Sequence, residues 1–103
     1  MSPLPLKKEQ TMATLIKIDG TREAIQPKNG KCFKLEELQK QVGGFIEYVG
    51  LSEEEIMVIN EEGKLMNLAV NENATDIALD NEAITFWDFI VGDVVICKKS
   101  ELQ

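Results

Sequence analysis

Three pairs of short β-type segments, each joined by a glycine-containing turn, constrain this chain more than any other feature of its sequence. The first pair surrounds Asp19-Gly20, one of the strongest signals for a two-residue hairpin turn. Because hairpins pair neighbouring strands antiparallel, the pattern predicts a mostly antiparallel sheet. The three hairpins are predicted at 13–18 with 21–25, at 55–60 with 64–68, and at 84–91 with 94–97.

A helix and a further strand are predicted between the first two hairpins. Leu35, Leu38 and Val42 recur at the spacing of one helix face, and Gly43-Gly44 supplies a natural stop. The aromatic and β-branched run at 45–49 then predicts a strand that returns across this helix.

A second, shorter helix is predicted over 70–78, where apolar residues again recur at helical spacing and Asn71 or Asn73 could cap the start. The fold class is therefore α+β, a mostly antiparallel sheet built from hairpins with one main helix and one short helix. Its opening order of two strands, a helix and a strand also suits a β-grasp-like start.

The length of 103 residues suits one domain, predicted at 13–98 between a flexible arm at 1–12 and a tail at 99–103. Translation could start at Met1 or at Met12. No apolar run is long enough for a membrane span and no export signal is visible, which predicts a cytoplasmic protein without membrane contact. Cys32 and Cys97 are then expected as reduced thiols, with a single disulfide as the alternative.

The net charge of −7 is concentrated in one half of the chain. Residues 43–97 carry twelve acidic side chains and one cation, Lys64. Binding to phosphates requires clustered basic residues, and the one such cluster is Lys28, Lys31 and Lys34, so direct nucleic-acid binding is not expected. The acidic half is read as a solubilising surface, a docking surface for a basic protein, or a mimic of a nucleic-acid backbone.

The chain contains no histidine, which removes the commonest general base, the Ser-His and Cys-His nucleophile pairs and imidazole zinc sites. The acids offer an alternative, a carboxylate hydrolase, but adjacent glutamates such as Glu53-Glu54-Glu55 point apart and are well solvated. The sequence therefore predicts a protein that is not an enzyme, with no catalytic residue, metal site or cofactor.

Three segments in order, 38–47, 60–65 and 88–95, together resemble domain of unknown function 3846. This is a small family found largely in phages and mobile elements, and the resemblance spans about residues 14–97. It implies an accessory protein of a mobile element. Because the family has no established activity, the resemblance implies no catalytic residue.

A ligand pocket is the first candidate site. Asparagine amides crowd around the second predicted hairpin and the start of the second helix, where they could line a polar pocket, although caps and turns use asparagine at the same positions. A glycine pair beside a glutamate could also let the backbone approach a ligand. The candidate residues are Asn60, Asn67, Asn71, Asn73, Gly43, Gly44 and Glu47.

An interaction surface is the second candidate site. In a regular strand at 86–91, Trp87 and Phe89 would share one face, and exposure of that face would indicate a protein interface or self-association. The remaining candidates are acidic residues of turns and of the second helix. The full set is Glu53, Glu54, Glu55, Glu72, Asp76, Asp80 and Trp87.

These observations predict a non-catalytic cytoplasmic binding module of mobile-element type that recognises an unidentified protein partner. One alternative is an acidic inhibitor that docks on a basic nucleic-acid-binding protein of the host. Another is a small-molecule-binding protein that uses the asparagine-rich region. A second copy of the chain, giving a homodimer, is the alternative partner.

Overall fold

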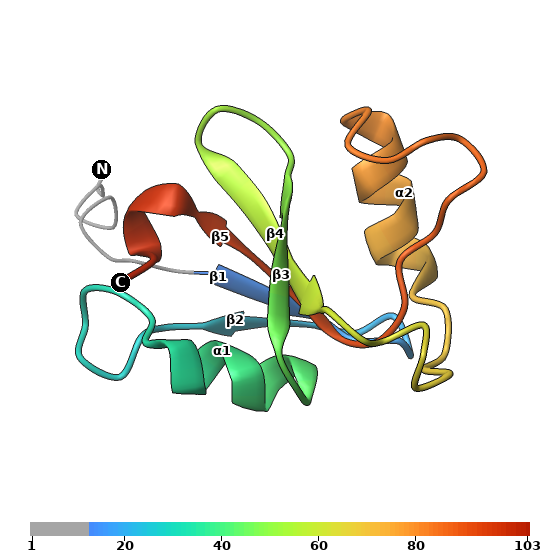
Figure 1. The fold of residues 1–103 in the computed structure, drawn as a ribbon. Coiled ribbons are helices and arrows are strands. Elements are labelled where there is room, and N and C mark those ends of the chain that lie inside the picture. The colour runs from blue at the N-terminus through green and yellow to red at the C-terminus, as the bar shows by residue number, and fades with distance from the viewer. Residues whose placement is uncertain (1–12) are drawn as a thin grey trace.

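Five strands form one sheet in the order β2-β1-β5-β4-β3 in the computed structural model, which describes residues 13–103 (Figure 1). Every pairing in the sheet is antiparallel, and two α-helices accompany it, so the predicted α+β class is confirmed. The elements are β1 (Ala13–Ile16), β2 (Arg22–Ile25), α1 (Leu35–Val42), β3 (Ile46–Gly50), β4 (Glu55–Asn60), α2 (Glu72–Asp80), β5 (Val94–Lys98) and the 3₁₀ helix η2 (Lys99–Glu101).

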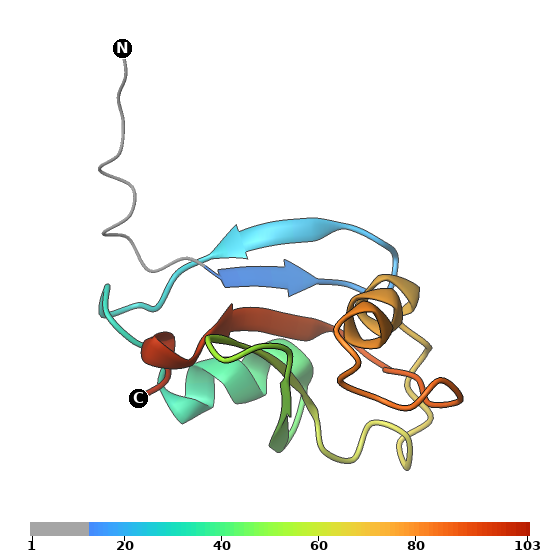
Figure 2. The same cartoon turned by 90° about the horizontal axis from the view of Figure 1, so that it is seen from above.

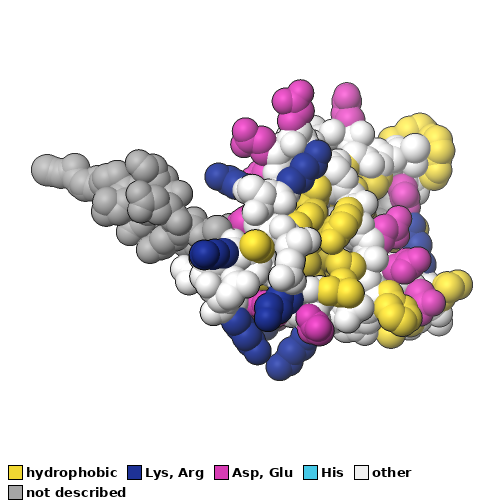
Figure 3. Space-filling model, turned by 60° about the vertical axis from the view of Figure 1, so that its left-hand side comes forward, with side chains coloured by type: hydrophobic (Ala, Val, Ile, Leu, Met, Phe, Trp, Pro, Cys, Tyr) yellow, Lys and Arg dark blue, Asp and Glu magenta, His cyan; other side chains and the backbone are white. Residues whose placement is uncertain are grey.

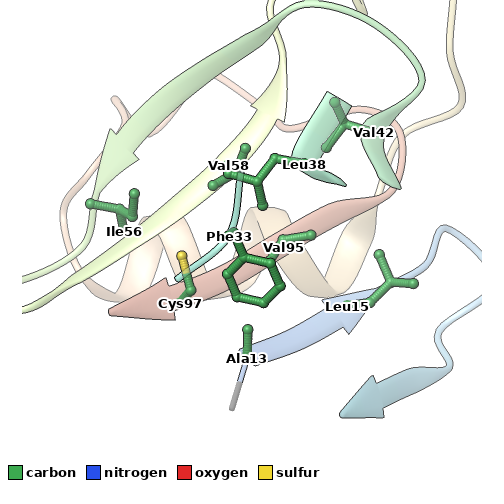
Figure 4. Close-up of a cluster of buried hydrophobic side chains, with 9 residues drawn as sticks. All are labelled: Ala13, Leu15, Phe33, Leu38, Val42, Ile56, Val58, Val95 and Cys97. Atoms are coloured by element: carbon green, nitrogen blue, oxygen red, sulfur yellow. The ribbon is translucent and has the colours of Figure 1, made fainter. Parts of the chain in front are cut away.

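Each face of the sheet carries its own hydrophobic cluster, because successive strand residues point to opposite faces. On one face α1 packs Leu38 and Val42 against the sheet, and Phe33 completes the cluster. Figure 4 shows the ring of Phe33 near the centre of this cluster, with Leu38 directed toward Val58 of β4. On the other face α2 packs Ala74 and Ala78 against a second cluster. The second cluster comprises Ile16, Leu51, Met57, Ala74, Ala78, Ile90 and Val94.

The first predicted hairpin is confirmed. β1 and β2 pair with Ala13 opposite Ile25 and Ile16 opposite Arg22, and Asp19-Gly20 lies in the turn between them. Figure 2 shows β2, β1 and β5 side by side across the sheet. The opening order of two strands, a helix and a strand is also as expected.

The second predicted hairpin is wrong. Residues 55–60 form β4, but its partners are β3 and β5, and residues 61–67 form a series of turns. β4 is buried on both faces, and the β-branched residues of β3 and β5 pair with it on its two sides. The segment predicted as its partner instead leaves Leu65 and Met66 exposed. Asn67, with φ of 59°, also adopts a left-handed conformation that no regular strand contains.

The third predicted hairpin is wrong as well. Residues 84–90 contain no strand, and Val91 makes only an isolated bridge with Val70. The backbone N–H of Asp88 donates to the carbonyl of Thr85 at 2.9 Å, which closes a turn at the point where the predicted strand would have continued. β5 pairs with β1 and β4 instead.

Both predicted helices are present, but the second is not the shorter one, since α2 has nine residues and α1 has eight. α1 begins where the Glu37 carboxylate accepts the backbone N–H groups of Lys28 and Lys34, at 3.0 and 3.1 Å. These two hydrogen bonds and the nearby lysines hold the pKa of Glu37 below its usual value. The helix ends at Gly43, whose φ of 82° is left-handed, so the predicted stop is confirmed.

The segment predicted as a C-terminal tail lies against the body of the protein. Residues 99–101 form η2, Glu101 is buried, and Leu102 forms a parallel bridge with Phe33. The arm predicted at 1–12 lies outside the described residues.

Cys32 and Cys97 are both free thiols, and they are expected to react at very different rates. Burial raises the pKa of Cys97 to about 12, with smaller contributions from Glu101 and Glu55, whereas Cys32 is only half-buried. Because the thiolate is the reacting form, iodoacetamide at pH 8 should modify Cys32 first and Cys97 only after denaturation. Intact-mass measurement over time checks this, and two fast additions to the folded protein would contradict it.

Candidate functional site

A groove of about 690 Å³ lies between the β3–β4 hairpin and the segment 82–91, which leads from α2 toward β5. Figure 1 shows this segment looping outward after α2 before the chain returns to β5. Val49 and Ile59, on the α2 face of the sheet near its β3 edge, are only partly buried and line this groove. Its lining combines apolar side chains with exposed carboxylates.

The segment 82–91 is anchored to the body by buried polar groups on α2. Thr75 Oγ1 accepts the backbone N–H of Ile90 at 2.9 Å. Asn71 accepts the N–H of Ala74 through Oδ1 and donates through Nδ2 to the carbonyls of Ile16 and Gly92, at 3.0 and 2.8 Å. The amide of Asn71 thus caps α2 and joins it to β1 and to the C-terminal end of this segment.

Lys64 ties the turns at 61–67 to the opposite wall of the groove. Its ammonium forms an ion pair with Asp88 and lies 4.4 Å from the centre of the Phe89 ring, a cation–π distance. The hydrogen bond from Lys64, followed by the one from the Phe89 N–H, holds the pKa of Asp88 below its usual value. Lys64, the single cation of the acidic half, is thereby engaged within the protein.

Two exposed aromatic residues, Phe86 and Trp87, lie in sequence between Thr85 and Asp88, which line the groove. Phe86 is 85% exposed and Trp87 is 69% exposed, and their rings meet edge to face with centroids 4.7 Å apart. Leu65, also 85% exposed, belongs to the groove lining. We call Leu65, Phe86 and Trp87 the aromatic rim. Figure 3 shows one side of the molecule, where exposed hydrophobic side chains have both basic and acidic side chains around them.

The family model described as Domain of unknown function (DUF3846) matches residues 6–102 of this chain. The chain belongs to the DUF3846 family. The match spans nearly the whole chain and agrees with the resemblance drawn from the three sequence segments. No curated protein and no solved structure matches the chain significantly.

The predicted ligand residues of this DUF3846 chain do not gather at one place. Asn60 and Glu47 line the groove, whereas Gly43 borders a different hollow beside Gly92. Asn60 is buried, with its amide donating to the Val42 carbonyl at 3.1 Å and accepting from the Glu62 N–H at 2.8 Å. A Cβ on Gly44 would lie 3.0 Å from that same amide.

The other predicted asparagines serve the backbone or lie at the surface. Asn71 is buried and saturated by the three hydrogen bonds given above. Asn67 is exposed in its left-handed turn, and Asn73 is half-buried near Gly20. The buried amides of this set are therefore occupied by structural contacts.

The predicted interaction residues are all exposed. Glu53 and Glu54 lie in the turn between β3 and β4, Glu55 opens β4, and the three acids on α2 face solvent. Trp87 and Phe89 are exposed, but they lie in a loop and not on the regular strand face whose exposure was expected to indicate an interface. The α2 acids are Glu72, Asp76 and Asp80.

Sequence reasoning missed Phe86, Leu65 and Lys64 as site residues. Assigning residues 84–91 to a strand placed Phe86 and Trp87 on opposite faces, whereas the turn at Asp88 leaves both exposed. The available signal was the carboxylate of Asp88 within an aromatic run, which a buried strand would accommodate poorly.

Within residues 13–103, no helix is both long and apolar enough to cross a membrane. The same stretch of chain holds no group of three acidic or cysteine side chains placed to share a metal ion.

Replacing Lys64 with methionine is expected to raise the pKa of Asp88 toward its usual value, because the largest cause of its lowering is removed. A carboxyl whose pKa is lowered by folding stabilises the protein above its unfolded pKa and loses that contribution as pH falls. The stability difference between wild type and Lys64→Met should therefore shrink below about pH 4. NMR titration of Asp88 measures the shift. Lys40→Met, on α1, is the control, and an unchanged Asp88 in Lys64→Met would contradict the assignment.

Proposed function

We propose that this DUF3846 protein is a non-catalytic protein-binding module whose docking surface is the groove together with its aromatic rim. The observation that carries the proposal is the exposure of Phe86 and Trp87, which lie between the groove residues Thr85 and Asp88 in sequence, together with the exposure of Leu65 in the groove lining. Large aromatic side chains are enriched in protein interfaces, where burying them supplies much of the binding free energy. Hydrogen bonds from Asn71 and to Thr75 hold this segment in place while its aromatic side chains are exposed to water. A fixed, exposed apolar surface of this kind is what a protein partner would bury.

A protein partner fits the groove better than a small molecule does. The volume of about 690 Å³ is in the range of small-molecule sites. Such sites, however, fix a ligand with a few free polar groups, and the buried amide of Asn60 is already bonded to the backbone. Phe86 and Trp87 are exposed but are not part of the groove lining, so a ligand confined to the groove leaves them exposed to water.

We extend the proposal to the setting of the protein, an accessory role in a mobile element within the cytoplasm. The family resemblance supports the first part. The second is supported by Cys32 and Cys97, which remain free thiols, as is usual in a reducing compartment.

Affinity capture followed by direct binding tests the proposal. A protein retained from a host extract is identified, purified and titrated against wild type, the double variant Phe86→Ser, Trp87→Ser, and the control Leu35→Ser. Leu35 is exposed on α1, away from the groove. Because Trp87 is the single tryptophan of the chain, its fluorescence reports binding in wild type and Leu35→Ser, and calorimetry measures the affinity of all three proteins, including the double variant without tryptophan.

The expected result is a change in Trp87 emission on binding and an affinity weakened about 30-fold or more in the double variant, with Leu35→Ser unchanged. Equal affinity for all three proteins would overturn the proposal. Binding that is lost instead on charge reversal of Glu53, Glu54 and Glu55, with the rim variant unaffected, would favour the acidic inhibitor.

A further inference from the structure

We propose that the partner docks as an extended peptide that adds a sixth strand to the free edge of β3, with apolar and basic side chains in alternation. This inference rests on the proposed protein-binding function and specifies the partner's chemistry. Its first support is the sheet order, which places β3 at one edge beside the groove.

The outward backbone groups of β3 can be identified from the hydrogen bonds at its two ends. Glu61 donates to the Phe45 carbonyl at 2.8 Å and Leu51 donates to the Glu55 carbonyl at 3.0 Å, so residues of odd number face β4. The N–H and C=O groups of Ile46, Tyr48 and Gly50 therefore point away from the sheet. Within residues 13–103 they have no backbone partner.

The edge of β3 lacks two of the features with which sheets usually protect a free edge, and its one charged residue is Glu47. It contains no proline or lysine, and Tyr48 is half exposed. The opposite edge, β2, opens with Arg22 and carries Glu23, which forms an ion pair with Lys17 at 2.9 Å. The groove described above is lined by β3 and not by β2. Strand addition is therefore expected at β3 rather than at β2.

The two faces of β3 determine which side chains the added strand must carry. Ile46 and Tyr48 lie on the α1 face, where an added strand would place apolar side chains beside them. Glu47 lies on the α2 face, toward the groove, and Glu61 and Glu82 also line that groove. Since Lys64 is already paired with Asp88, these carboxylates have no basic partner in the groove lining. Basic side chains are thus expected on the α2 face of the added strand.

The length of the partner segment follows from β3. Five strand residues span about 17 Å, so a segment of about five to seven residues covers the edge. Because side chains alternate, this segment should read apolar, basic, apolar, basic along its length.

Fluorescence titration with designed peptides tests the inference, with Trp87 as the reporter. The probes are an eight-residue peptide of alternating valine and lysine, its counterpart of valine and glutamate, and the valine–lysine peptide N-methylated at every backbone nitrogen, which removes the donors of both edges. All are used below the concentration at which they self-associate. The expected result is binding of the valine–lysine peptide alone, with affinity at least about tenfold above the other two.

Two protein variants locate the binding edge. Tyr48→Pro removes an outward N–H of β3 without removing a hydrogen bond to β4, and Ala24→Pro is the matched change on the free edge of β2. Tyr48→Pro should abolish peptide binding and Ala24→Pro should retain it. If Tyr48→Pro fails to fold, Glu47→Lys replaces it, with a preference shifted to the valine–glutamate peptide as the expected result.

Each other outcome decides against the inference. Equal binding of the methylated peptide would exclude strand addition. Concentration-dependent self-association that Tyr48→Pro abolishes would show that a second copy covers the edge. If no peptide binds while the captured partner still requires the aromatic rim, this inference fails and the proposed function stands. If the captured partner does not require the rim either, both fail.

Discussion

Replacing Asn71 with alanine is expected to lower the free energy of unfolding by about 3–5 kcal/mol. The side chain is 1% exposed and makes three hydrogen bonds, to the Ala74 N–H and to the carbonyls of Ile16 and Gly92. Loss of the cap costs about 1 kcal/mol, and each of the two lost hydrogen bonds to a buried carbonyl costs about 1–2 kcal/mol. Few single side chains join three separate segments in this way.

Chemical denaturation followed by circular dichroism measures this loss. The matched control is Asn73→Ala, two residues further on, where the side chain is half-buried and makes no hydrogen bond to the described residues. That change should alter the free energy of unfolding by less than about 0.5 kcal/mol. Equal effects of the two substitutions would show that the Asn71 amide does not anchor the segment 82–91.

Replacing Gly92 with alanine is expected to cost about 2–4 kcal/mol. Gly92 has a φ of 79°, a left-handed conformation that alanine adopts with strain, and a Cβ there would lie 2.9 Å from Leu68 Cδ1. Either the Leu68 side chain or the backbone of Gly92, whose carbonyl Asn71 binds, must then shift. The substitution therefore disturbs the same anchor from the other side.

The control for Gly92→Ala is Gly50→Ala, where an added Cβ meets no atom within 4 Å and φ is not left-handed. Thermal unfolding should show a melting temperature lower by about 10–25 °C for Gly92→Ala and nearly unchanged for Gly50→Ala. A melting temperature of Gly92→Ala within about 2 °C of wild type would contradict the close packing of Leu68 against Gly92.

Local sequence signals correctly predicted the elements whose structure depends mainly on residues close to them in sequence. Asp19-Gly20 identified the β1–β2 hairpin because its turn chemistry is local. The spacing of Leu38 and Val42 identified α1, and Asn71 was one of two predicted caps of α2.

The wrong predictions concern segments whose pairing depends on strands or side chains far away in the sequence. Residues 64–68 follow β4 directly, but β4 is saturated by β3 and β5, which no local pattern reveals. Likewise, the turn at Asp88 depends on Lys64, 24 positions away, as well as on its own backbone. The acidic candidate residues are exposed, as expected for charged side chains. The aromatic rim could not be predicted from the sequence, because its exposure depends on Phe86 and Trp87 lying in a loop.

The most direct test of the central claim, that β3 and its groove form the docking surface, is amide hydrogen exchange by NMR with and without the valine–lysine peptide. The claim predicts that exchange at Ile46, Tyr48 and Gly50 slows on peptide addition, while the outward amides of Arg22 and Ala24 on β2 are unchanged. Exchange at Tyr48 that is unaffected by bound peptide, or protection that appears on β2 instead, would contradict it.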